Sequence, residues 1–161
     1  MDFNQRLQKA VERGQKNRDL REREEAARAM SEEECRRLHS KFRLQLTDHI
    51  EGCMKQLVDY FPGFRPETIV GENGWGSAVS RDDVSITKGR ARDGNYSRLE
   101  MLVTPLGKYH VLNVAVKGTI RNKEVFNRTH YQLLGEVDID AFNETIDLWA
   151  LEYAELFAMQ A

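Results

Sequence analysis

The chain has 161 residues, of which 40% are hydrophobic and 31% are charged, and its formal net charge is −2 at pH 7. This length suits one domain with a single core, and the near-neutral charge argues against nucleic acid as the main partner. The sequence contains no signal-peptide core and no apolar run long enough to span a membrane, so we expect a cytoplasmic protein without a membrane segment.

Charge is unevenly distributed along the chain. Residues 136–161 contain seven acidic residues and no Lys or Arg, whereas residues 1–43 carry a balance of +3. An acidic carboxyl-terminal segment beside a basic amino-terminal segment predicts charge matching within the chain or between subunits.

Residues 1–30 are predicted to form a charged, coiled-coil-like helical extension that is solvated or partly disordered. Its first turns place apolar residues on one helical face: Phe3, Leu7, Ala10 and Val11. After Gly14 this stripe fades, and oppositely charged pairs four residues apart stabilise a helix by only about 0.2–0.5 kcal/mol each. We therefore treat residues 31–161 as the single folded domain.

The strongest helix prediction covers about residues 31–61, where apolar residues recur at intervals of three and four. These residues are Cys35, Leu38, Phe42, Leu46, His49, Ile50, Cys53, Leu57, Tyr60 and Phe61. Pro62 and Gly63 then predict its end.

Residues 67–134 predict an antiparallel meander of four strands, with a fifth strand less firmly indicated, because β-rich runs alternate with turn dipeptides. The proposed turns are Asn73-Gly74, Asp93-Gly94, Leu106-Gly107 and Arg121-Asn122. With the last three turns centred there, one face of the sheet collects Val84, Ile86, Leu99, Met101, Val103, Leu112, Val114, Val116, Val125, Tyr131 and Leu133. The fold class expected is an α+β two-layer sandwich with helices covering that face.

A last helix over about residues 139–160 carries the apolar stripe that would lie on the sheet: Phe142, Ile146, Trp149, Tyr153, Leu156 and Phe157. Leu148, Leu151 and Met159 point away from this stripe. A helix that is apolar on more than one side usually has a second neighbour, which is either the 31–61 helix or another copy. We expect a homodimer formed through helices.

The same turns predict a polar row across the opposite face of the sheet, consisting of Thr87, Glu100, Asn113 and His130 with Arg98 and Arg128 beside it. A carboxylate, an amide and an imidazole in reach of two guanidinium groups suit a small-ligand or anion site, or a weak general acid–base site. The alternative is a water-facing sheet whose opposite charges pair across strands.

Both cysteines and two of the four histidines lie in the 31–61 helix, as Cys35, His39, His49 and Cys53. They share a helical face, but the two cysteines are too far apart along one helix for a disulfide or a shared metal ion. An antiparallel helix pair in a dimer, crossing at Leu44, would form two metal sites of two cysteines and two histidines each. The alternative is core packing without metal, and we expect no bound cofactor.

A basic patch is predicted around the 88–98 turn, where Lys88, Arg90 and Arg92 precede Arg98. It supports nucleic-acid binding only weakly because acidic residues lie nearby. The leading hypothesis is a non-enzymatic interaction module that self-associates through helices and binds a protein partner. Ligand binding at the polar row is the alternative, and nucleic-acid binding through the 88–98 loop is a third hypothesis.

Overall fold

The structure, a computed structural model, describes the backbone of residues 2–85 and 93–160, and the side chains of these residues except 26–30, 84–85 and 93. The chain divides into two compact units, Met1–Arg37 and Leu38–Ala161. Helix α1 (Phe3–Tyr60) supplies all of the secondary structure described in the first unit and the first element of the second unit.

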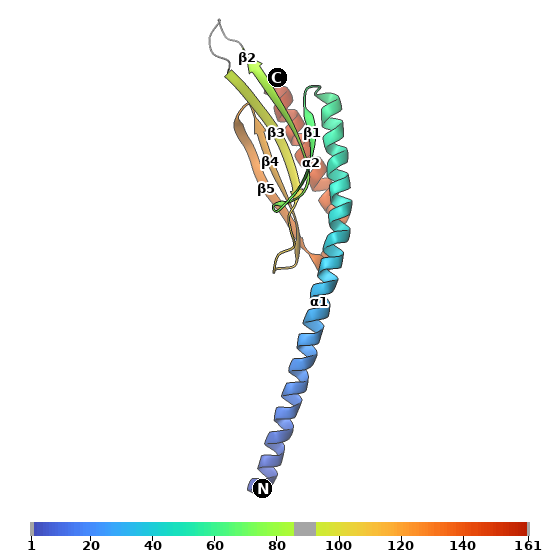
Figure 1. Ribbon diagram of the computed structural model, residues 1–161, viewed down its shortest axis with the longest axis vertical. Coiled ribbons are helices and arrows are strands. Elements are labelled where there is room, and N and C mark those ends of the chain that lie inside the picture. Colours follow the sequence, from blue (N-terminus) through green and yellow to red (C-terminus); the bar gives the residue numbers. More distant parts are fainter. Residues whose placement is uncertain (1, 86–92, 161) are drawn as a thin grey trace. The chain divides into compact units, whose positions relative to one another are not determined.

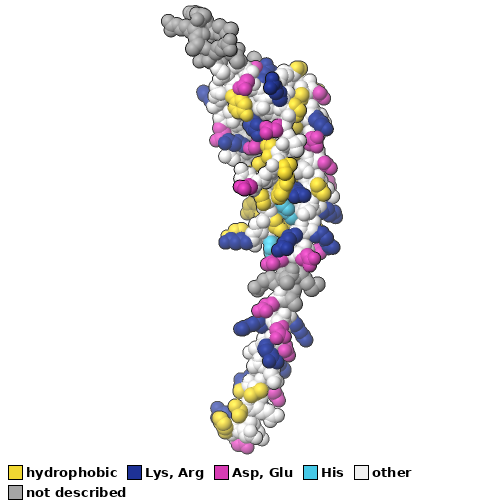
Figure 2. All heavy atoms as spheres, in the orientation of Figure 1, with side chains coloured by type: hydrophobic (Ala, Val, Ile, Leu, Met, Phe, Trp, Pro, Cys, Tyr) yellow, Lys and Arg dark blue, Asp and Glu magenta, His cyan; other side chains and the backbone are white. Residues whose placement is uncertain are grey.

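The first unit is a charged helical segment. The Asp2 carboxylate accepts a hydrogen bond from the Gln5 backbone N–H at 2.8 Å, which satisfies one free amide at the start of the helix. All described side chains of residues 2–34 are exposed. Figure 2 shows Lys and Arg side chains interspersed with Asp and Glu along this helix and hydrophobic side chains near its first turns. The predicted charged helical extension is confirmed.

The second unit is an α+β sandwich, as predicted (Figure 1). Five antiparallel strands follow one another in the order of the chain: β1 (Arg65–Gly71), β2 (Gly74–Ser85), β3 (Asp93–Val103), β4 (Val111–Ile120) and β5 (Lys123–Leu133). A short 3-10 helix, η1 (Leu134–Glu136), leads into helix α2 (Ile139–Gln160). Residues 38–60 of α1 and the whole of α2 cover one face of the sheet.

The core lies between this helix layer and the sheet. Helix α1 contributes Leu46, Ile50 and Met54, and α2 contributes Phe142, Ile146 and Tyr153, each at most 1% exposed. The sheet contributes Leu99, Met101, Val103, Leu112, Val114 and Val116, which are equally buried and belong to the predicted apolar face. The hydroxyl group of Tyr153 donates a hydrogen bond to the Thr119 carbonyl at 2.9 Å, so the polar end of this buried side chain is satisfied.

Two of the predicted hairpins are confirmed. Arg121 and Asn122 have φ values of 48° and 70°, as a two-residue hairpin of type I′ requires, and Ile120 pairs with Lys123. The hairpin predicted at Asn73-Gly74 forms with its turn one residue earlier: Gly71 pairs with Gly74, and the loop is Glu72-Asn73. The fifth strand therefore exists.

The predicted Asp93-Gly94 turn is wrong, because both residues lie in β3 and pair with Ser85 and Val84 of β2. The side chain of Asn122 holds this part of β3 extended: it donates to the Gly94 carbonyl at 2.8 Å and accepts from the Tyr96 N–H at 2.9 Å. The connection between β2 and β3, including Ile86, lies outside the described residues.

The predicted Leu106-Gly107 turn is also displaced. Val103 pairs with Val114, and residues 104–110 form the connection between β3 and β4. Pairing ends where Thr104 donates its N–H to the Asn113 carbonyl at 3.0 Å, because the next residue, Pro105, has no N–H to donate. The register differs from the prediction by an even number of residues, so β3 and β4 keep their predicted apolar faces.

Strand β5 is turned over relative to the prediction. The register shifts by one residue between Gly118 and Thr119, and a one-residue shift sends every following side chain to the opposite face. Phe126 is consequently buried and packs edge-to-face on Tyr153, whereas Tyr131 and Leu133 are 66% and 52% exposed. Burying the larger aromatic side chain in place of Val125 explains the bulge, since Phe gains more from burial.

Candidate functional site

The predicted polar row is not assembled. Glu100 lies opposite Lys117 instead of Asn113, His130 lies opposite Val114 on the helix-facing side, and Thr87 lies outside the described residues. His130 packs edge-to-face on Phe142 of α2, with 4.8 Å between ring centroids. The shifted β3–β4 register and the bulge at Val125 within β5 are the physical causes.

The two arginines of the predicted row pair with different carboxylates. Arg98 contacts Glu67 at 3.0 Å and Glu100 at 3.4 Å across the outer face of the sheet. Arg128 makes two hydrogen bonds to Glu152 of α2, at 2.6 and 3.1 Å. Each guanidinium group is therefore already matched by acidic groups.

Asn113, another residue of the predicted row, contacts Thr104 instead of Glu100 or His130. Its side-chain amide donates to the Thr104 hydroxyl at 3.2 Å, so it holds the end of the β3–β4 pair. The basic patch of Lys88, Arg90 and Arg92 lies outside the described residues, and nucleic-acid binding there stays a prediction.

His39 is a core residue. It is 4% exposed, its Nε2–H donates to the Thr104 carbonyl at 3.1 Å, and its ring lies edge-on to Trp75 with centroids 6.4 Å apart. Burial lowers the pKa of His39, and the nearby Arg43 lowers it further, while the bond to Thr104 opposes both. The imidazole is engaged inside its own chain, which fits the core-packing alternative for His39. The dimer-bridging metal site stays an untested hypothesis.

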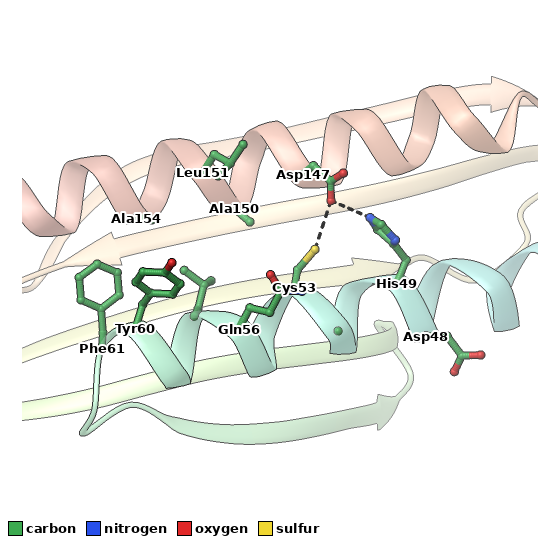
Figure 3. Close-up of a pocket in the computed structure, with 12 residues that line it drawn as sticks. Asp48, His49, Cys53, Gln56, Tyr60, Phe61, Asp147, Ala150, Leu151 and Ala154 are labelled. Atoms are coloured by element: carbon green, nitrogen blue, oxygen red, sulfur yellow. Dashed lines mark hydrogen bonds and ion pairs between the residues drawn. The ribbon is translucent and has the colours of Figure 1, made fainter.

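A groove runs along the outer side of the helix layer between α1 and α2 (Figure 3). Its volume is about 770 Å³, within the usual range of ligand pockets. We call it the helix groove; it is lined by Asp48, His49, Gly52, Cys53, Gln56, Leu57, Tyr60, Phe61, Asp147, Ala150, Leu151 and Ala154. Two of these residues are acidic and none is Lys or Arg.

Three polar side chains meet at one end of the helix groove. His49 and Cys53 project from successive turns of α1 toward Asp147 of α2 (Figure 3). The distance from His49 Nε2 to Asp147 Oδ1 is 2.7 Å, and Cys53 Sγ donates to the same oxygen at 3.3 Å. One donor atom from each residue lies within 4.8 Å of the other two. We call this set the His-Cys-Asp cluster.

The His-Cys-Asp cluster is not arranged as a thiol nucleophile with its base. Cys53 bonds to the carboxylate rather than to the imidazole, and burial together with the Asp147 carboxylate raises the pKa of the Cys53 thiol to about 12. A nucleophilic cysteine needs a lowered pKa. The cluster instead offers nitrogen, sulfur and oxygen donors, a set that suits a transition-metal ion.

Asp147 is the member of the His-Cys-Asp cluster that the sequence did not reveal. The spacing of His49 and Cys53 on one helical face was visible, but their shared partner lies 98 and 94 residues away along the chain. Cys35, the other cysteine, is a free thiol in the first unit.

Comparison of the chain with protein-family models, with curated proteins and with solved structures gave no match in any of the three. Within residues 2–85 and 93–160, no helix combines the length and apolar character needed to cross a bilayer.

Proposed function

We propose that this chain is a non-enzymatic, cytoplasmic interaction module that forms a homodimer through its helices. In this proposal, the apolar stripe of Phe3, Leu7 and Val11 on one copy docks into the helix groove of the other copy. We call these three residues the amino-terminal stripe. The observation that carries the proposal is the complementary apolar and charged character of these two surfaces.

The amino-terminal stripe is exposed and regularly spaced. Phe3, Leu7 and Val11 are 77%, 49% and 52% exposed and follow one another at intervals of four on α1. An amphipathic helix that binds a groove presents its anchors at such intervals. A row of exposed apolar side chains on a helix therefore supports a role in binding.

The helix groove offers a matching apolar surface. Leu151 at its edge is 65% exposed and Tyr60 is 83% exposed, and Leu148 on the same helix as Leu151 is 58% exposed. Exposed apolar residues gathered around a hollow are typical of interaction sites. The volume of the groove, about 770 Å³, leaves room for several side chains of a partner helix.

The charges of the two surfaces are opposite. Beside the amino-terminal stripe, α1 carries Arg6, Lys9, Arg13 and Lys16 with Glu12 as the single acid between them. The helix groove contains Asp48 and Asp147 but no basic residue, and α2 has no Lys or Arg along its whole length. Complementary charges steer association and favour one partner over others, which favours a second copy of this chain as the occupant.

A reducing compartment fits a chain whose two cysteines are free thiols, which supports the cytoplasmic assignment. The His-Cys-Asp cluster lacks an activated nucleophile, which supports a non-enzymatic role. Small-ligand binding at the predicted polar row has no support in the observed register.

The experiment is sedimentation equilibrium of the full chain and two surface variants. Leu151→Glu places a charge in the helix groove, and Leu7→Glu places one in the amino-terminal stripe. We expect each variant alone to associate at least about 10-fold more weakly than the wild type, because an apolar anchor meets a buried charge. Leu44→Glu and Leu20→Glu, at exposed positions outside both surfaces, serve as matched controls that retain wild-type association.

A mixture of the two variants tests the pairing itself. Leu151→Glu retains an intact amino-terminal stripe and Leu7→Glu retains an intact helix groove, so together they are expected to form a mixed dimer with one working contact. A symmetric groove-to-groove contact would not recover on mixing. A strictly monomeric wild type, or variants that associate like the wild type, would overturn the proposal.

A further inference from the structure

The His-Cys-Asp cluster contains more ligating groups than packing of two helices requires. We propose that His49 Nε2, Cys53 Sγ and one Asp147 carboxylate oxygen bind a single divalent ion of the zinc class within one chain. The fourth coordination position of this ion opens into the helix groove. The inference does not depend on the homodimer, because all three ligands belong to the same unit.

The identity of the donors selects the class of ion. Zinc accepts imidazole nitrogen, thiolate sulfur and carboxylate oxygen in one tetrahedral site. Calcium and magnesium prefer six or more oxygen ligands, and a site with one carboxylate offers too few. Thiolate and imidazole ligands also bind cobalt(II), which supplies a spectroscopic substitute for zinc.

The distances between the donors are close to those of a tetrahedral site. With bonds of about 2.0–2.3 Å, two ligands of a tetrahedral zinc ion lie about 3.3–3.8 Å apart. Cys53 Sγ and Asp147 Oδ1 are already 3.3 Å apart, and His49 Nε2 and Asp147 Oδ1 are 2.7 Å apart. The imidazole and the carboxylate would have to separate by about 0.6–1 Å. All three donor atoms lie within 4.8 Å of one another, so adjustments of about 1 Å would bring the set to tetrahedral spacing.

The backbones that carry the ligands are held by the core. Ile50 and Met54 directly follow His49 and Cys53 and are at most 1% exposed, and Ile146, directly before Asp147, is fully buried. Each ligand therefore projects from a helix turn that is anchored by its neighbour. Sites on rigid elements keep their ligand geometry better than sites on loops.

The charges of the cluster balance the ion. A neutral imidazole, a thiolate and a carboxylate together carry two negative charges, which match a divalent cation. On binding, Cys53 releases its thiol proton to solvent, and the bonds from His49 and Cys53 to Asp147 Oδ1 are replaced by bonds to the ion. Three protein ligands leave one position for water or an exchangeable anion, and all three ligands line the helix groove.

The experiment titrates the chelator-treated full chain with Zn²⁺ in competition with a chromophoric indicator, and separately with Co²⁺ followed by absorption. We expect one ion per chain, tight Zn²⁺ binding, no comparable binding of Ca²⁺ or Mg²⁺, and a thiolate-to-cobalt charge-transfer band. Cys53→Ser, His49→Gln and Asp147→Asn should each weaken Zn²⁺ binding by at least about 100-fold, since even outer-shell partners of metal ligands are worth about 10–100-fold.

Two matched variants serve as controls. Cys35→Ser removes the other thiol and Asp48→Asn removes the other carboxylate at the helix groove, and both are expected to retain wild-type affinity and the full charge-transfer band. Circular dichroism of each variant before titration tests whether the variant is folded. If Cys53→Ser or His49→Gln is unfolded, the Zn²⁺ affinity of the isosteric Asp147→Asn variant tests the inference. Absent Zn²⁺ binding by the wild type, or binding that the three ligand variants leave unchanged, would overturn the inference. Repeating the titration with Leu7→Glu separates this result from that of the homodimer proposal.

Discussion

The two stretches of α1, residues 3–25 and residues 38–60, have the same backbone conformation but are stabilised by different interactions. Every side chain in the first stretch is exposed, whereas the second stretch buries Leu46, Ile50 and Met54 almost completely. The first stretch depends on local hydrogen bonds, namely those of the helix backbone and the Asp2 cap. The second depends on contacts with the sheet and α2.

This difference shows what a hydrophobic stripe contributes to a helix. Most helical stability in proteins comes from packing of an apolar face rather than from intrinsic propensity. A stripe of three residues, as in residues 3–11, is exposed and adds little to the stability of the helix. A stripe that continues for six turns becomes part of a core.

Of the substitutions that test this difference between the two stretches, Ile50→Ala is expected to lower the free energy of unfolding most. Ile50 is fully buried in the second stretch, and removing a large aliphatic side chain from a core lowers the free energy of unfolding by about 2–5 kcal/mol. Chemical denaturation followed by circular dichroism measures this change.

Val11→Ala is the matched control in the first stretch. Val11 is 52% exposed, and substitutions at exposed positions usually change the free energy of unfolding by less than about 0.5 kcal/mol. Measured at a concentration where the wild type is monomeric, equal losses for Val11→Ala and Ile50→Ala would contradict the distinction between the two stretches.

A smaller, pH-dependent effect is expected from His39 in the second stretch. Burial lowers the pKa of His39 in the folded state, so below pH about 6.5 the unfolded chain binds a proton at this position more readily than the folded chain does. The free energy of unfolding should therefore be greatest above this pH and fall as the pH decreases toward the folded-state pKa.

The His39→Gln variant isolates that contribution from the other titrating groups. The difference in the free energy of unfolding between wild type and variant, measured from pH 7.5 to pH 5, is expected to shrink with decreasing pH. A constant difference across this range would show that His39 does not resist protonation in the folded state.

The sequence was sufficient for the fold class and for most of the residues that face the core on α2, β3 and β4. On α1 it missed Met54, which is 1% exposed, and placed Tyr60 on the apolar face although Tyr60 is 83% exposed. These predictions rest on periodicity, which a short segment carries by itself. The prediction from sequence failed for β5, because a single extra residue at Val125 reverses the face of the strand. Whether this bulge forms depends on the competition between Val125 and Phe126 for the space near Tyr153, which is a tertiary contact. The displaced β2–β3 turn depends in the same way on Asn122, which is distant in sequence.

The candidate site could be predicted only in part for the same reason. The spacing of His49 and Cys53 is a local feature, and it identified two of the three residues of the His-Cys-Asp cluster as candidates. Asp147 completes the cluster through the packing of α2 beside α1, which no local pattern specifies. The polar row on the sheet depended on three registers at once, and all three differ from the prediction.

Hydrogen exchange of the full chain at two protein concentrations tests the central claim most directly. In dilute protein, the backbone amides of residues 3–25 should exchange much faster than those of residues 46–57, because exchange protection follows burial and packing. In concentrated protein, residues 3–11 and the groove residues 48–61 should gain protection together. Equal protection of both stretches in dilute protein, or no gain in residues 3–11 on concentration, would contradict the account.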